Sequence, residues 1–131
     1  MKMDQWMKSL ALCCMALILS TQTQAQEHVN GQLWMDTEGN HINAHGGNII
    51  QYNNTYYWYG ENRPYSGGST ETGIAVYSSA DLKTWKNEGI ALSVSNEQGH
   101  DIERGCIMER PKVVYNEKTR KFVMLFHLEL K

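Results

Sequence analysis

Charged residues gather around a proline in the stretch 108–115, which reads MERPKVVY. Glu109, Arg110 and Lys112 flank Pro111, and Val113–Tyr115 directly after them has the apolar character of a buried strand. A carboxylate in a pocket can exchange protons or accept hydrogen bonds from a ligand. The stretch therefore has two interpretations, as a plain surface loop or as a polar pocket at the end of a sheet.

Glu61 is a second carboxylate in a similar setting. It follows the aromatic run Tyr56–Tyr59, so it stands at the end of an expected strand. It could form a carboxylate pair with Glu109 across a pocket, the arrangement that acid–base hydrolysis uses. The alternative is a loop carboxylate that lies beside Arg63.

Two histidines precede the first expected strand. His45 stands before Gly46 and Gly47, where it could contact a ligand or simply hydrogen-bond to the backbone of a turn. His41 and His45 are four residues apart, a spacing that suits a metal ion on a helix. Because the glycine pair argues against a helix, we expect no metal site here.

Short apolar and aromatic runs separated by turn residues predict an all-β chain. Asn53–Thr55 between two such runs is typical of a hairpin turn. Residues 60–72 contain Gly60, Pro64, Gly67 and Gly68 and are expected to form a loop. After residue 25, no stretch has a sustained apolar period of 3.6 residues. The expected strands are 49–52, 56–59, 74–77, 89–92, 113–115 and 122–126.

The pattern of short strand, asparagine turn and aromatic strand occurs twice. Setting Ile49 against Val113 gives an offset of 64 residues and aligns His45 with Glu109. A four-stranded unit that repeats at such a period predicts the blades of a β-propeller. The first strand of a blade lies innermost, so the residues that begin it can face a shared axial pocket. His45 and Glu109 would then occupy the same place on consecutive blades.

Residues 1–25 have the pattern of a secretory signal peptide. Two lysines come first, an apolar run of ten residues spans 10–19, and a small polar segment ends at Ala25. The run is too short to span a bilayer, which argues against a membrane anchor, and Leu12 before Cys13 argues against lipid attachment. We expect an exported protein, periplasmic or extracellular, without membrane contact after cleavage and with a flexible segment at 26–32.

After cleavage the chain would carry a net charge of about −3 and one cysteine. It has no basic stripe, so nucleic acid is a poor candidate partner. Cys106 has no second cysteine with which to pair and is expected to be a small buried side chain. Phosphate loops, zinc spacings, a nucleophile elbow and a dinucleotide fingerprint are absent from the sequence.

Five motifs, taken in order, resemble the start of glycoside hydrolase family 43, in the branch of exo-β-1,3-galactanases and related galactosidases. The resemblance covers about residues 33–128, nearly all of the mature chain. It implies a five-bladed β-propeller with an axial sugar pocket and an oligo- or polysaccharide substrate, β-1,3-galactan or arabinogalactan. The motifs are Asp36–Thr37, Ile42–Gly47, Tyr56–Glu61, Tyr77–Leu82 and Glu109–Val113.

The resemblance also implies roles for single residues. The family hydrolyses with inversion, which needs an acid and a base on opposite faces of the sugar. Most members place an aspartate base on the first innermost strand, where this chain has His45. In the resembling branch the base, like the acid, belongs to a later blade. Glu109 takes the role of a sugar-contacting carboxylate that activity requires.

His45, Glu61 and Trp58 are the further substrate contacts expected. Tyr57, Trp58 and Tyr59 alternate across a sheet, so core packing is favoured for at least two of them, and any could stack on a sugar. Trp85 is expected in the core of the blade. No cofactor is expected, and the resemblance leaves open a calcium ion in the axial channel.

Residues 33–131 are expected to be the N-terminal part of such a propeller. Five units of about 64 residues need roughly 320 residues, and the chain supplies the first blade and part of the second. We expect it to be inactive alone, because the acid and base lie elsewhere, and unstable as an open propeller. The alternatives are a non-catalytic sugar-binding propeller and a propeller used for protein contacts.

Overall fold

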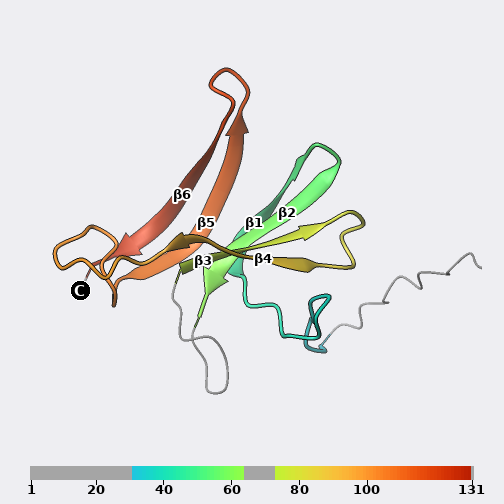
Figure 1. The fold of residues 1–131 in the computed structure, drawn as a ribbon, viewed down its shortest axis with the longest axis horizontal. Coiled ribbons are helices and arrows are strands. Elements are labelled where there is room, and N and C mark those ends of the chain that lie inside the picture. The colour runs from blue at the N-terminus through green and yellow to red at the C-terminus, as the bar shows by residue number, and fades with distance from the viewer. Residues whose placement is uncertain (1–30, 64–72, 131) are drawn as a thin grey trace, which may run out of the picture.

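The computed structural model describes residues 31–63 and 73–130, and every regular element in these ranges is a β-strand (Figure 1). The signal peptide expected at 1–25 and most of the segment 26–32 lie outside them. No helix in the described ranges could cross a membrane. All six expected strands are present, and each is longer than expected: β1 (His45–Tyr52), β2 (Thr55–Asn62), β3 (Gly73–Ser79), β4 (Lys86–Ser93), β5 (Ile107–Asn116) and β6 (Lys121–Glu129).

The first four strands form one antiparallel sheet in chain order, β1-β2-β3-β4. The β1–β2 hairpin turns at Asn53 and Asn54, whose φ angles are 49° and 60°. Positive φ at both positions is what a type I′ turn requires, and asparagine tolerates it. This four-stranded meander is the blade unit that the turn pattern predicted.

The remaining strands, β5 and β6, form a separate antiparallel pair that packs against the first sheet (Figure 1). β5 lies beside β1, the first strand of the four-stranded sheet. The two first strands are therefore neighbours, as the innermost strands of consecutive blades would be. The chain comprises one four-stranded blade and two strands of the next, in agreement with the expected fold.

The core of the first blade is an aromatic cluster around Trp85, which is completely buried. The ring centroid of Trp58 lies 5.3 Å from that of Trp85 and 5.2 Å from that of Trp34. Tilted aromatic pairs at these distances add to the stability gained from burial alone. Trp85 is the core tryptophan that the sequence predicted.

A second apolar cluster joins the two sheets. Ile74 of β3 and Met108 of β5 are buried there, together with Cys106 before β5. Three side chains of β6 pack against them: Met124, Phe126 and Leu128. The prediction of Cys106 as a small buried side chain is confirmed.

The loop expected at 60–72 begins later than predicted. Gly60, Glu61 and Asn62 belong to β2, and 64–72 lie outside the described residues. A Cβ atom on Gly60 would overlap the backbone of Ala44. The glycine therefore marks a place where two backbone segments pass closely, and it does not mark a turn.

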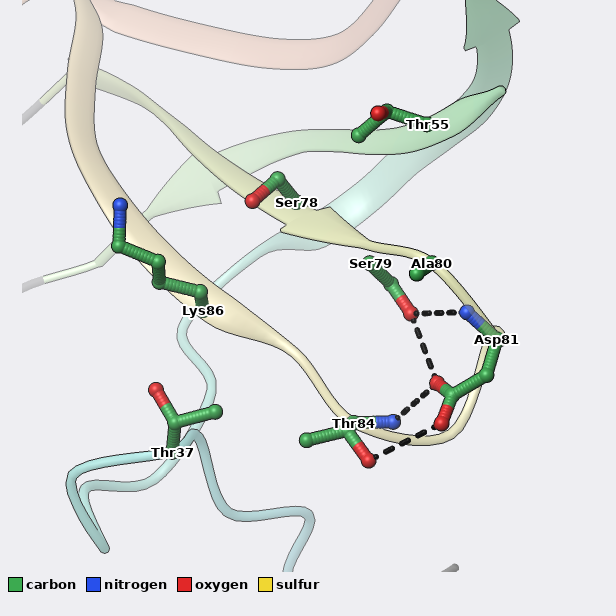
Figure 2. A pocket seen from close by; sticks show the side chains of 8 residues that line it. All are labelled: Thr37, Thr55, Ser78, Ser79, Ala80, Asp81, Thr84 and Lys86. Carbon is green, nitrogen blue, oxygen red and sulfur yellow. Dashed lines mark hydrogen bonds between the residues drawn. The ribbon is translucent and has the colours of Figure 1, made fainter.

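The connection between β3 and β4 is a turn built around Asp81 (Figure 2). Asp81 Oδ1 accepts hydrogen bonds of 2.8 Å from the N–H groups of Thr84 and Lys83, and Oδ2 accepts one from Thr84 Oγ1. These donors favour the ionised carboxylate and lower the pKa of Asp81 from 3.8 to about 2. The turn is held by a charged acceptor.

We predict that this turn loosens only in strong acid. The folded pKa of Asp81 lies below its unfolded value, so the turn's contribution to stability is complete above about pH 4 and is lost as the pH falls through 2. The amide NMR shifts of Lys83 and Thr84 should titrate with a midpoint near pH 2. They should lose this titration in the D81N variant, and a midpoint near the ordinary aspartate value would contradict the prediction.

Candidate functional site

The structure brings Glu61 and Glu109 together at one arginine. Arg63 Nη2 lies 2.9 Å from Glu61 Oε2 and 3.2 Å from Glu109 Oε1. The two glutamate side chains are mostly covered, with exposures of 13% and 23%. Glu61 belongs to the first sheet and Glu109 to the second. The cluster therefore bridges the two sheets, and its residues were expected either to face a pocket together or to pair with Arg63.

Arg63 holds the two negative charges close to each other. Its hydrogen bond to Glu61 and the charges of Glu61 and Glu109 raise the pKa of Arg63 above its already high value, so the guanidinium stays charged. Both contacts share one nitrogen, so the two carboxylate oxygens that contact it lie at most about 6 Å apart. Beside a cation, both carboxylates can accept hydrogen bonds from a ligand.

The backbone places His45 and Glu109 at equivalent positions on their strands. His45 pairs with Glu61 across the β1–β2 ladder, and Glu109 pairs with His127 across the β5–β6 ladder. In each ladder the regular pairing breaks directly after that residue and resumes three residues later. The alignment of His45 with Glu109 is thus visible in the backbone.

Each break is a bulge with the same backbone conformation. Gly46 has a φ of 57°, and Arg110, which is 64 residues further on, has a φ of 51°. A residue other than glycine in this left-handed region costs about 1–2 kcal/mol. Arg110 therefore adopts a strained conformation, whereas Gly46 adopts the same conformation without strain. Pro111 follows in the second bulge and is fully buried. Its lack of an N–H group is harmless where the ladder is interrupted.

Asn43 fixes the backbone of Arg63. Its Nδ2 donates to the Arg63 carbonyl at 2.6 Å, and its Oδ1 accepts from the Arg63 N–H at 3.1 Å. The Asn43 side chain is buried, and its own N–H donates to the Tyr77 hydroxyl at 3.1 Å. A buried amide with both ends bonded is a rigid support, so Asn43 positions the arginine that holds the two carboxylates.

Two further side chains tie β1 to β5. Asn48 Nδ2 donates to the Val113 carbonyl at 3.0 Å, and Asn48 Oδ1 accepts from the Val113 N–H at 2.9 Å. Lys112 Nζ donates to the carbonyls of Gly46 and Gly47 at 3.2 and 2.8 Å. Lys112 therefore reaches across to the bulge of the neighbouring strand.

His45 and Trp58 have different relations to the cluster. His45 is exposed and stands opposite Glu61, so the ladder brings it to the edge of the site. Trp58 alternates with Tyr59 along β2 and packs on the aromatic cluster, whereas Tyr59 packs on the apolar cluster between the sheets. Trp58 is partly buried against the aromatic cluster, and the sugar contact predicted for it stays a prediction.

One hollow in the described surface is lined by residues of this cluster, and a larger one lies far from it. One of about 100 Å³ is lined by Glu61 and Arg63 together with Cys106, Ile107 and Met108. A larger one of about 340 Å³ lies at the Asp81 turn, at the opposite end of β2 and β3 (Figure 2). Among the described residues, no three His, Cys, Asp or Glu side chains gather so as to hold a metal ion.

Sequence reasoning missed the residues that support the site. Arg63 was considered only as a neighbour of Glu61, although alternate residues of an extended chain share a face, and that spacing was a usable signal. Asn43 and Asn48 were given no role. Their partners lie 20 and 65 residues away, so no local pattern marks them.

Several solved structures are similar to this chain, and they include β-1,3-galactosidases and exo-β-1,3-galactanases. The chain is 67% identical to a β-1,3-galactosidase of glycoside hydrolase family 43 solved with galactodeoxynojirimycin, with a TM-score of 0.71 over 77% of this chain and 29% of that one. It is 40% identical to an exo-β-1,3-galactanase from Phanerochaete chrysosporium solved with β-1,3-galactotriose, with a TM-score of 0.66 over 76% and 23% of the two chains. For a Clostridium thermocellum exo-β-1,3-galactanase the identity is 41% and the TM-score 0.66, over 78% and 21%.

These relatives are five-bladed β-propellers, which agrees with the fold that the family resemblance implies. The chain spans between 21% and 29% of the length of these three structures. No protein-family profile and no curated protein matches it.

We predict that Asn43 is needed to hold Arg63 in place. The N43A variant leaves the Arg63 N–H and carbonyl without their side-chain partner, and it should lower the free energy of unfolding by about 2–4 kcal/mol. In N43A, hydrogen exchange at the Arg63 amide should become at least about tenfold faster, because the hydrogen bond from this amide to Asn43 Oδ1 is lost. Urea unfolding of the whole gene product, and its amide exchange followed by NMR, measure both effects.

The matched control is N87A. Asn87 is exposed and accepts one hydrogen bond from the Gly89 N–H, so its loss should cost less than about 1 kcal/mol. Equal destabilisation by N43A and N87A would contradict a special role for Asn43.

Proposed function

Since this chain belongs to glycoside hydrolase family 43, we propose that it forms part of the sugar pocket of a glycosidase that releases galactose from β-1,3-galactan. The observation that carries the proposal is the meeting of Glu61 and Glu109 at Arg63, 2.9 and 3.2 Å from one guanidinium nitrogen. The identity of 67% to a β-1,3-galactosidase, and of 40% to an exo-β-1,3-galactanase solved with β-1,3-galactotriose, supports galactose as the bound sugar.

The chemistry of the cluster suits a sugar. A pyranose presents several hydroxyl donors around one ring, and two adjacent carboxylates can accept from neighbouring hydroxyl groups. Arg63 compensates the charge of the carboxylates and limits their movement, so less ordering is required when a sugar binds. His45 stands beside Glu61 at the exposed margin, where its imidazole would contact the same ring or the next one.

Glu61 and Glu109 are proposed to bind the sugar, and the acid–base pair is assigned to other parts of the protein. Inverting hydrolysis needs its two carboxyl groups about 6.5–9.5 Å apart to admit a water molecule. Arg63 binds one oxygen of each carboxylate, so its guanidinium stands between the two groups. An arginine shared by both groups also occupies the space that the water would need. Inversion, with its acid and base on later blades, is part of the proposal.

Export is part of the same proposal. The signal-like residues 1–25 would deliver the enzyme to the periplasm or the outside of the cell, where a polysaccharide substrate is found. By itself the stretch 33–131 is proposed to be inactive, because it holds sugar contacts without an acid and a base. A calcium ion in the axial channel stays an open expectation.

A non-catalytic sugar-binding propeller is the second candidate. One observation favours it: Arg63 holds both carboxylates of the described residues for binding, and neither of them is assigned as an acid or a base. The two candidates differ in a single outcome, because both predict that galactose oligosaccharides bind and only the first predicts that galactose is released.

The test is galactose release from β-1,3-galactan by the whole gene product, including whatever the gene encodes after the codon for Lys131. The E109Q variant should lower kcat/KM by about 100-fold and E61Q by about 10-fold or more, because each removes a charged hydrogen-bond acceptor from the sugar. The control E117Q changes an exposed residue in the β5–β6 turn and should leave the rate unchanged.

Binding of β-1,3-galactobiose without any release of galactose would favour the second candidate. Neither binding nor release would overturn both candidates. Normal activity in both E109Q and E61Q would contradict the assigned pocket while leaving the enzyme class intact.

A further inference from the structure

Two consecutive backbone carbonyls in the bulge of β1 point at one place. The oxygens of Gly46 and Gly47 lie 3.2 and 2.8 Å from the same atom, Nζ of Lys112 in β5. In a regular strand the carbonyls of neighbouring residues point to opposite sides, toward the strands on either side. The bulge therefore directs to a single point two acceptors that a regular strand would keep apart.

The two glycines make this backbone path possible. Gly46 has a φ of 57°, in the left-handed region that glycine enters without strain. A Cβ atom on Gly47 would overlap the carbonyl group of Tyr59 on β2. The β1–β2 pairing is interrupted between His45 and Asn48, so the two peptide units lie outside the regular ladder. Their carbonyls can therefore bind a group that comes from outside the first sheet.

A pair of carbonyl oxygens at one point favours a cation. Both atoms carry partial negative charge and can only accept hydrogen bonds, whereas an ammonium group has three donors and no acceptor. Lys112 follows Asn48 by 64 residues, so it has the position in the second blade that Asn48 has in the first. The repeat of the blade unit thus places an amide or an ammonium at this position. The paired carbonyls explain why an ammonium is suitable in β5.

A calcium ion does not fit at these carbonyls. Calcium takes about six to eight oxygen ligands, many of them from carboxylates. Among the described residues, no three acidic, histidine or cysteine side chains gather to hold a metal ion, and Glu61 and Glu109 are bonded to Arg63. A divalent ion beside the two oxygens would also be repelled by the ammonium of Lys112. The calcium ion that the family resemblance left open therefore has no place at this bulge.

We propose that the carbonyls of Gly46 and Gly47 form a binding site for a primary ammonium group, and that Lys112 is its built-in ligand. Hydrogen bonds from a charged donor are stronger than neutral ones, so the contact joins β1 to β5 firmly and fixes the peptide units directly after His45. β1 and β5 are the innermost strands of neighbouring blades, so a closed propeller keeps this contact. The inference does not depend on the proposed activity.

The site should accept a small free amine when the lysine side chain is removed. The test is the thermal stability of the whole gene product, measured by calorimetry for the parent, K112A and K112M. Both variants should lower Tm by about 3 °C or more, because two charged hydrogen bonds are lost. Methylammonium at about 100 mM should restore at least half of this loss in K112A, because it binds only the folded state. It should not restore K112M, in which the methionine side chain fills the space.

Three controls separate binding from general effects of salt and charge. Tetramethylammonium has the same charge as methylammonium and no N–H group to donate, so it should restore neither variant. Calcium chloride at the same ionic strength should restore K112A less than methylammonium does. The K118M variant removes a lysine from the β5–β6 turn and should change neither Tm nor its response to amines.

A further variant keeps the test usable if K112A does not fold. The guanidinium in K112R keeps the charge and the donors, so K112R should lose less than half of the Tm that K112M loses. An equal loss in K112R and K112M would contradict a site for a cation.

Several outcomes would overturn the proposal. An unchanged Tm in both K112A and K112M would mean that the contact adds nothing to stability. Restoration of K112A by calcium and not by methylammonium would mean that the carbonyls form a metal site that the lysine covers. Equal effects of methylammonium and tetramethylammonium would indicate a salt effect. No restoration of K112A by any of these ions would mean that the two carbonyls do not form a binding site.

Discussion

The arrangement of this molecule depends on the amide side chain of Asn48. β1 and β5 belong to different sheets, and no backbone ladder joins them. The amide of Asn48 makes the two hydrogen bonds that the backbone of a paired strand would make. It donates to the Val113 carbonyl at 3.0 Å and accepts from the Val113 N–H at 2.9 Å. These two bonds, with those from Lys112 to the Gly46 and Gly47 carbonyls, set the alignment of the strands along their length. Once the alignment is set, the residues that begin β1 and β5 lie beside each other, and Glu109 meets the arginine that also binds Glu61.

The candidate site occupies the places where regular pairing is interrupted. Each first strand is broken by a bulge at the same point, 46–47 in β1 and 110–111 in β5. Groups released from the ladders bond across the two sheets, as Lys112 does with the carbonyls of Gly46 and Gly47. Behind them, Asn43 holds the backbone of Arg63 from a buried position. The carboxylates are therefore supported by rigid elements, which is what a binding site needs in order to orient a ligand.

Much of the fold could be predicted from the sequence, because local patterns determine it. Alternation and asparagine turns indicated six strands, and the offset of 64 residues indicated that His45 and Glu109 are equivalent. Features that depend on distant partners could not be predicted. Period-two alternation shows that Trp58 and Tyr59 face opposite ways, and only packing decides that Trp58 joins the core. Gly60 resembled a loop residue because the nearby backbone of Ala44 leaves no trace in the local sequence.

The central claim is that Glu61, Arg63 and Glu109 together form the wall of a galactose site. A crystal structure of the whole gene product with bound galactose tests it most directly. The account predicts sugar hydroxyl groups within hydrogen-bonding distance of both glutamates, with Arg63 still joining them and Trp58 still in the core. Galactose bound elsewhere, for example in the hollow at the Asp81 turn, with the three side chains facing away from it, would contradict the account.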